Sequence, residues 1–304
     1  RLYPWIHRRL GSAVAARCSR SNAKAKALRH DPPPLGVMRA AEVWGKRWSA
    51  CESSLSRRYM ETVVAKQSLV ILAADRYNMA GLFELIDEVS EYVVALKTHV
   101  DLVEDWSPSA WSDFIGQAAA ADLLIFEDRK HGDIGKIARD QMGGIYDSRN
   151  WADLMTAHMI SGPSVLDGMA EAWNSVGREG GVLLLAQMSS AGNLLETPGY
   201  SEAVVAVGKQ HPACFGFIGN GSRPEELSQL RQLVGDGRII WTPGVSISAQ
   251  EGELGQRYGN PSQAVISGSD GIIVGGGIHR ADSPSDAAKT YAEMSWQALL
   301  ERGI

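Results

Sequence analysis

Short apolar runs recur along the chain from about residue 69, and most are followed by a longer stretch rich in Ala, Leu and Glu. The runs occupy residues 69–75, 92–101, 121–130, 152–160, 181–189, 214–219, 238–245 and 271–277. Short runs that are apolar at successive positions are typical of parallel strands buried on both faces. The helix-like stretches occupy residues 79–90, 109–120, 163–176, 225–234 and 287–303. This alternation predicts an α/β protein, a closed (β/α)8 TIM barrel.

A doubly wound open sheet is the alternative arrangement of alternating strands and helices. Such sheets that bind dinucleotides carry a glycine-rich turn after the first strand. Here the first apolar run ends in "AADRYN", which contains no glycine. The sequence therefore favours the barrel.

Composition and cysteine content narrow the class of protein. The chain has 304 residues, of which 44% are hydrophobic and 21% charged, as in ordinary globular proteins. No apolar run approaches the roughly 18 residues of a membrane-spanning helix. Three widely separated cysteines, Cys18, Cys51 and Cys214, show neither disulfide-framework nor zinc-ligand spacing. We therefore expect a cytoplasmic protein without a membrane partner or a metal.

Charge is distributed unevenly along the chain. Residues 1–60 hold thirteen Lys or Arg and three Asp or Glu, a charge of +10, so residues 61–304 carry −15 of the total −5. We predict a basic N-terminal extension over 1–60 and a catalytic barrel over 61–304. The extension could pack on the barrel or a partner subunit, direct the chain to an organelle, or bind nucleic acid.

Most acids and bases that follow the predicted strands should gather at one rim, because strand ends and the loops after them form the active-site face of such barrels. These positions are Asp75, Lys97, His99, Asp101, Asp128, Lys130, Asp133, His158, Ser189, Thr242, Pro243, Gly244 and the glycines at 275–277. Alternation in a strand would give Lys97, His99 and Asp101 one common face, and Asp128 and Lys130 another on the next strand. The nine tryptophans are spread over helices and termini, which indicates packing and argues against a nucleic-acid platform.

Alternating lysines and carboxylates at this rim can carry decarboxylation. Each lysine keeps a neighbouring carboxylate ionised, and each carboxylate keeps a lysine charged. A fixed carboxylate beside the scissile carboxylate of a substrate would repel it, and a lysine could protonate the carbanion that remains. The plain alternative is a network of ion pairs that only closes the top of the barrel.

Ordered motifs over residues 66–304 resemble the orotidine 5'-monophosphate decarboxylase family, in particular its eukaryotic branch. They include "LAAD", "ALKTHVDL", "LLIFEDRKHGDIG", "WADLMTAH", "AQMSSAG", "TPGV" and "LGQRY". The resemblance implies a lyase that converts orotidine monophosphate to uridine monophosphate without metal or organic cofactor. It also implies a homodimer with shared active sites, acting on a small-molecule carboxylate.

The resemblance implies roles for individual residues. Lys97, Asp128, Lys130 and Asp133 match the family's charged tetrad, in which Lys130 would deliver the proton, Asp128 would crowd the leaving carboxylate and Asp133 would come from the second subunit. The implied substrate-binding residues are Asp75 and Lys97 at the ribose, Ser189 at the pyrimidine, Gln256 and Tyr258 in a closing loop, and Pro243, Gly244, Gly275 and Gly276 at the phosphate. His99 and Asp101, on the predicted face of Lys97, join the substrate-binding set.

Several positions depart from the family pattern. Gly276 stands where the phosphate loop normally carries an arginine, and His131, Lys136, Ile137 and Gln187 replace other usual residues. His279 or Arg280 could supply the missing charge. The alternative is a divergent paralogue that acts on a non-phosphorylated or differently anionic substrate, in specialised metabolism. A third hypothesis is a non-catalytic scaffold that uses the basic extension, but it predicts decay of the charged network, which is intact.

Overall fold

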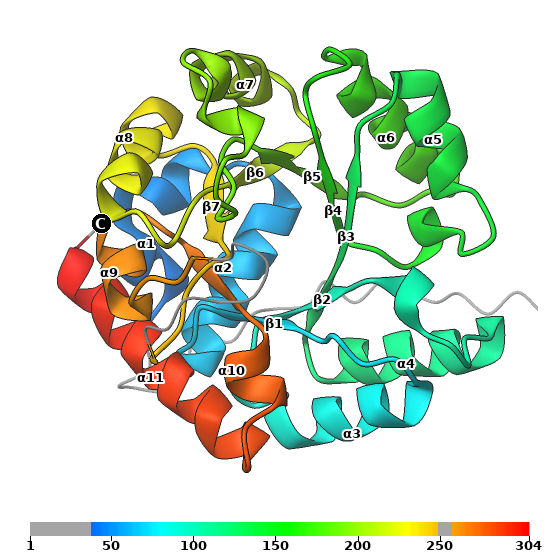
Figure 1. Ribbon diagram of the computed structural model, residues 1–304, viewed down its shortest axis with the longest axis horizontal. Coiled ribbons are helices and arrows are strands. Elements are labelled where there is room, and N and C mark those ends of the chain that lie inside the picture. The colour runs from blue at the N-terminus through cyan, green and yellow to red at the C-terminus, as the bar shows by residue number, and fades with distance from the viewer. Residues whose placement is uncertain (1–37, 249–256, 304) are drawn as a thin grey trace, which may run out of the picture. The chain divides into compact units, whose positions relative to one another are not determined.

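Eight parallel strands close into a barrel in the computed structural model, which describes residues 38–248 and 257–303 (Figure 1). The strands are β1 (Val70–Ala73), β2 (Ala95–Thr98), β3 (Leu124–His131), β4 (Leu154–Ala157), β5 (Gly181–Leu185), β6 (Cys214–Ile218), β7 (Ile239–Thr242) and β8 (Gly271–Val274). Each strand pairs with the next, and β8 returns to β1 through the pairs Val70↔Ile272 and Leu72↔Val274. The predicted (β/α)8 barrel is confirmed.

Helices surround the strands, as Figure 1 shows. They are α1 (Ala40–Ala50), α2 (Ser54–Lys66), α3 (Met79–Val89), α4 (Pro108–Ala120), α5 (Gly135–Met142), α6 (Ser164–Asn174), α7 (Tyr200–Gln210), α8 (Pro224–Val234), α9 (Pro261–Ile266), α10 (Gly276–His279) and α11 (Pro284–Arg302). Asn78, Ser107 and Ser283 each accept a hydrogen bond from a backbone N–H of the first turn that follows, which satisfies an otherwise unpaired donor. Within the described ranges, no helix combines the length and apolarity that crossing a membrane requires.

Helices α1 and α2 lie behind the strands in Figure 1 and pack against the end of the barrel where the strands begin. Tyr59 of α2 is buried, and its ring centroid lies 5.2 Å from that of Trp241 in β7. The compact unit that contains the barrel begins at Met38, and residues 1–37 of the predicted extension lie outside the described residues. The sequence pattern missed these helices because charged residues interrupt their apolar positions.

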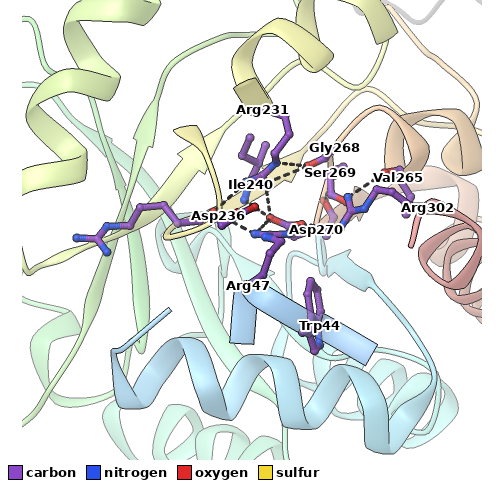
Figure 2. A network of polar contacts seen from close by, with 12 residues as sticks. Trp44, Arg47, Arg231, Asp236, Ile240, Val265, Gly268, Ser269, Asp270 and Arg302 are labelled. Atoms are coloured by element: carbon purple, nitrogen blue, oxygen red, sulfur yellow. Dashed lines mark hydrogen bonds and ion pairs between the residues drawn. The ribbon is translucent and has the colours of Figure 1, made fainter. Parts of the chain in front are cut away.

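A buried ion network joins α1 to the same end of the barrel (Figure 2). Asp270, directly before β8, is fully buried and accepts hydrogen bonds from Arg47, Arg231 and Arg302. Its Oδ2 also accepts the backbone N–H of Ile240 at 2.8 Å. Burial alone would raise the pKa of Asp270, but the three guanidinium groups outweigh it and hold that pKa far below its usual range. This network ties α1, α8 and α11 to the β7–β8 edge, away from the strand ends that carry the predicted site.

Candidate active site

A cavity of about 250 Å³ opens at the carboxyl ends of the strands. Its lining consists of Lys97, Phe126, Asp128, Lys130, Thr156, Leu185, Met188, Ser189, Ser190, Ile218, Pro243 and Ile273. The charged and hydroxyl groups come from β2, β3, β4 and the loop after β5, whereas the apolar groups come mainly from β3, β5, β6 and β8. This is the end of a (β/α)8 barrel at which catalytic groups gather.

Asp128 is the centre of the charged group in this cavity. Its Oδ2 lies 2.7 Å from Lys130 Nζ and 3.9 Å from Lys97 Nζ. Lys97 Nζ also lies 3.3 Å from Asp75 Oδ1, which links the ends of β1, β2 and β3. The side chains of Asp128 and Lys97 are largely buried, so water screens their attraction poorly. Two lysines and two carboxylates thus form one connected chain.

The irregular end of β3 positions Asp128 and Lys130. The pairing of β3 with β4 shifts between Glu127 and His131, which marks a bulge. Lys130 has φ +51°, a left-handed conformation that is uncommon outside glycine. Its backbone N–H donates to Thr156 Oγ1 at 2.8 Å, and that hydroxyl donates to Asp128 Oδ1 at 2.8 Å. Thr156 therefore holds both residues of the bulge.

Close packing of α5 against α6 fixes the segment that follows this bulge. A Cβ at Gly168 would overlap the carbonyl group of Gly135, and one at Gly135 would overlap that of Ser164. Glycine at both positions lets the two helix backbones meet. This contact fixes the position of α5 relative to α6, and so restrains the loop that joins Lys130 to α5.

The ionisation of the site follows from these contacts. Burial alone would raise the pKa of Asp128, but Lys130 and Lys97 outweigh it and the pKa lies below its usual value. Burial and the Lys97 ammonium lower the pKa of His99, so that its ring is neutral near pH 7. Since an ammonium group can only donate, Lys97 Nζ donates to His99 Nε2 at 2.8 Å, which places the ring proton on Nδ1.

Several predicted site residues come together at this cavity, namely Asp75, Lys97, His99, Asp128, Lys130, Ser189 and Pro243. The predicted common face of Lys97, His99 and Asp101 is wrong for Asp101. Strand β2 ends at Thr98 and the chain turns into a 3-10 helix, Val100–Leu102, so Asp101 pairs instead with Arg129 at 2.8 Å.

The other predicted residues lie around the mouth or apart from it. Asp133 is exposed, and its Oδ1 accepts the N–H of Ile134 at 2.7 Å. Tyr258 is 38% exposed and does not line the cavity, and Gln256 lies outside the described residues. Gly244 has φ +75° and follows Pro243 in the turn after β7. A Cβ on Gly275, in the turn after β8, would lie 3.8 Å from Asp75 Oδ2.

The remaining residues that depart from the family pattern do not line the cavity. Gln187 accepts the N–H of Asn220 and donates to the carbonyl of Glu226, so it joins loops. Lys136 forms an exposed pair with Asp140. The buried ring of His131 lies 3.1 Å from Gln141 Oε1. These three side chains therefore make local contacts outside the cavity.

Sequence reasoning missed Thr156 and Glu127. The available signal for Thr156 was a hydroxyl residue between apolar neighbours near the end of the fourth run. Glu127 is fully buried behind the cavity wall, where it accepts from the Thr98 hydroxyl at 2.6 Å and from the N–H of Val100 at 3.2 Å. Burial raises its pKa to about 7. In the parts of the chain that are described, no three His, Cys, Asp or Glu side chains are grouped to hold a metal ion.

A closed barrel with linked lysines and carboxylates at the carboxyl ends of its strands defines a TIM-barrel enzyme of acid–base chemistry. The model of the orotidine 5'-phosphate decarboxylase / HUMPS family matches residues 68–291. The chain belongs to this family.

Curated relatives and solved structures agree with the family model. Orotidine 5'-phosphate decarboxylase of Passalora fulva is 33% identical over 254 residues, which is 82% of this chain and 91% of that protein. The enzyme of that name from Schizosaccharomyces pombe is 32% identical over 268 residues, 87% of this chain and 97% of that protein. The crystal structure of orotidine 5'-phosphate decarboxylase from Pyrococcus horikoshii OT3 matches with a TM-score of 0.59 and 25% identity, covering 74% of this chain and 98% of that one.

Proposed function

We propose that this chain is a carboxy-lyase that converts orotidine 5'-monophosphate to uridine monophosphate. The observation that carries the proposal is the chain of contacts Asp75–Lys97–Asp128–Lys130 in the barrel mouth, in a member of this family. The relatives named above are orotidine 5'-phosphate decarboxylases, and they do not favour the alternative of a non-phosphorylated substrate.

Asp128 and Lys130 divide the chemical step between them. Because Lys130 and Lys97 keep Asp128 ionised, this carboxylate cannot relieve repulsion by taking a proton when the substrate carboxylate lies beside it. Breaking the bond to carbon dioxide removes the repulsion and leaves an electron pair on the pyrimidine carbon. Lys130 then donates a proton from Nζ to that carbon and regains one from solvent.

The other predicted residues bind and orient the substrate. Asp75 and Lys97 bind the ribose hydroxyls at the ends of β1 and β2, and Ser189 binds the pyrimidine edge. Pro243, Gly244, Gly275 and Gly276 surround the phosphate in the turns after β7 and β8. Apolar side chains of the cavity, such as Phe126 and Ile218, exclude water from the base. Without water, the electrostatic interactions between the charged residues and the substrate are stronger.

A second copy of the chain completes the site. Asp133 is exposed and forms no ion pair among the described residues, so its carboxylate is available to a partner's cavity. Large apolar side chains are exposed nearby, with Ile145 81% and Ile134 54% exposed, beside a hollow of about 610 Å³ that Lys130 and Asp133 also line. A homodimer would cover this surface and bring Asp133 to the neighbouring Lys130.

The division of roles is tested by comparing Asp128→Asn with Asp167→Asn in steady-state turnover of orotidine monophosphate. Asp167 is exposed on α6 and pairs with His211, so it provides the same chemical change outside the site. We expect Asp128→Asn to lower kcat at least about a hundredfold and Asp167→Asn to leave it unchanged. Equal kcat values for Asp128→Asn and the wild type would contradict the assigned role.

A further inference from the structure

Gly276 lies under the side chain of Arg280. A Cβ built on Gly276 would lie 2.5 Å from Arg280 Nε and 2.8 Å from its Cζ, so the guanidinium occupies the space of a side chain at 276. The two residues are four apart in and directly after α10. Side chains on a helix lean towards its N-terminus and cover the residue one turn earlier, which accounts for this placement.

The glycine at 276 is not explained by backbone conformation. It is absent from the glycines with positive φ, and it lies inside the helical turn. Because Gly276 has no side chain, the guanidinium of Arg280 has room above it. A residue with a Cβ at this position would displace that group.

Arg280 follows the glycine turn that borders the charged site, and its side chain is exposed. Gly275, adjacent to Gly276, approaches Asp75, which in turn contacts Lys97. Lys97 already faces two carboxylates, whereas the guanidinium of Arg280 is exposed and forms no hydrogen bond or ion pair across residues 38–248 and 257–303.

Two other basic residues, His279 of this turn and Arg76 from the loop after β1, are less suited to bind an anion. Arg76 donates to the carbonyl of His279 at 2.7 Å and so supports the backbone just before Arg280. Burial lowers the pKa of His279, whose ring is therefore neutral near pH 7. Arg280 is the group at this turn that offers both a full charge and free donors.

We propose that Arg280, folded back over Gly276, is the cation that binds the phosphate group of the substrate. The proposal rests on the function proposed above, which supplies a phosphate monoester as the ligand. The phosphate-binding arginine would thus be Arg280, one helical turn after position 276. Gly276 leaves the space that the Arg280 side chain occupies. A guanidinium at this place can donate two hydrogen bonds to phosphate oxygens.

The test is equilibrium binding of uridine monophosphate and of uridine, measured by titration calorimetry. The proteins are the wild type, Arg280→Ala, Arg280→Lys and Lys289→Ala, the last removing an exposed charge from neighbouring α11. Losing a charge-assisted hydrogen bond should weaken uridine monophosphate binding by about ten- to a hundredfold in Arg280→Ala. Arg280→Lys should recover part of it, and uridine binding should be the same in every protein.

A second pair of variants moves the charge along the helix. Gly276→Ala should weaken uridine monophosphate binding because its Cβ displaces the guanidinium. The double variant Gly276→Arg with Arg280→Ala should recover the affinity that Arg280→Ala loses. Because all readings are of binding, they do not depend on proton transfer by Lys130.

Two results would overturn the proposal and are distinguishable. If the wild type binds uridine monophosphate more tightly than uridine and folded Arg280→Ala does so equally, the Arg280 assignment is wrong while the proposed function stands. If the wild type shows no preference for the phosphorylated ligand and no turnover of orotidine monophosphate, the proposed function fails and the assignment fails with it.

Discussion

Replacing Asp270 by asparagine removes the one carboxylate at the centre of three buried guanidinium groups (Figure 2). The side chains of Arg47, Arg231 and Arg302 are 3%, 17% and 13% exposed, so solvent cannot replace the lost charge. The asparagine amide would also direct N–H donors at guanidinium donors. Breaking a buried ion pair on one side costs about 3–5 kcal/mol in free energy of unfolding.

Thermal unfolding followed by circular dichroism measures this cost. For a domain of this size, 1 kcal/mol shifts Tm by about 2–4 °C, so we expect Asp270→Asn to lower Tm by roughly 6–20 °C. The matched control is Asp140→Asn, which makes the same change in an exposed pair with Lys136 and Arg139 and should leave Tm unchanged. Turnover by Asp270→Asn below its melting temperature should equal that of the wild type.

Coupling between Asp270 and Arg47 separates the ion network from a general packing effect. In Asp270→Asn, an additional Arg47→Met change should cost less than it does in the wild type, because it removes a charge that is already uncompensated. A Tm of Asp270→Asn within about 2 °C of the wild type, or strictly additive effects of the two substitutions, would refute this reasoning.

Three further predictions concern residues around the site. Glu127 has a pKa of about 7 in the folded chain, against an ordinary value of 4.5. Between these pH values the folded chain binds one more proton than the unfolded chain, so the free energy of unfolding falls as pH rises. Glu127→Gln should flatten this pH dependence when it is measured by urea unfolding. Thr156→Val should lower kcat about tenfold or more at similar KM, since it removes the hydroxyl that holds Asp128; an unchanged kcat would contradict this. Gly168→Ala should destabilise the fold by about 1–3 kcal/mol, whereas Gly116→Ala on α4, with open space at its Cβ, should not.

The sequence was sufficient to predict the barrel because buried parallel strands are apolar on both faces and recur with helices between them. The same pattern placed Asp128 and Lys130 at one rim, because residues that end parallel strands share an edge. Asp101 was misplaced because the end of β2 at Thr98 and the following 3-10 turn leave no mark in the alternation.

Long-range contacts lay beyond the sequence pattern. Arg47 and Asp270 are 223 residues apart, and nothing in either segment indicates that they meet. The Gly276–Arg280 arrangement was also hidden, because the sequence showed a missing arginine and two nearby basic residues without showing which one turns back over the glycine. Only the fold distinguishes His279, whose pKa is lowered by burial, from the exposed side chain of Arg280.

The measurement that tests the central claim most directly is turnover of orotidine monophosphate by the wild type and by Lys130→Ala, beside orotidine and orotate, followed by loss of the substrate's ultraviolet band. We predict efficient conversion of the monophosphate by the wild type, weaker use of orotidine and orotate, and a loss of at least about a hundredfold in Lys130→Ala. A folded wild type that does not convert the monophosphate, or a Lys130→Ala variant as active as the wild type, would contradict the account.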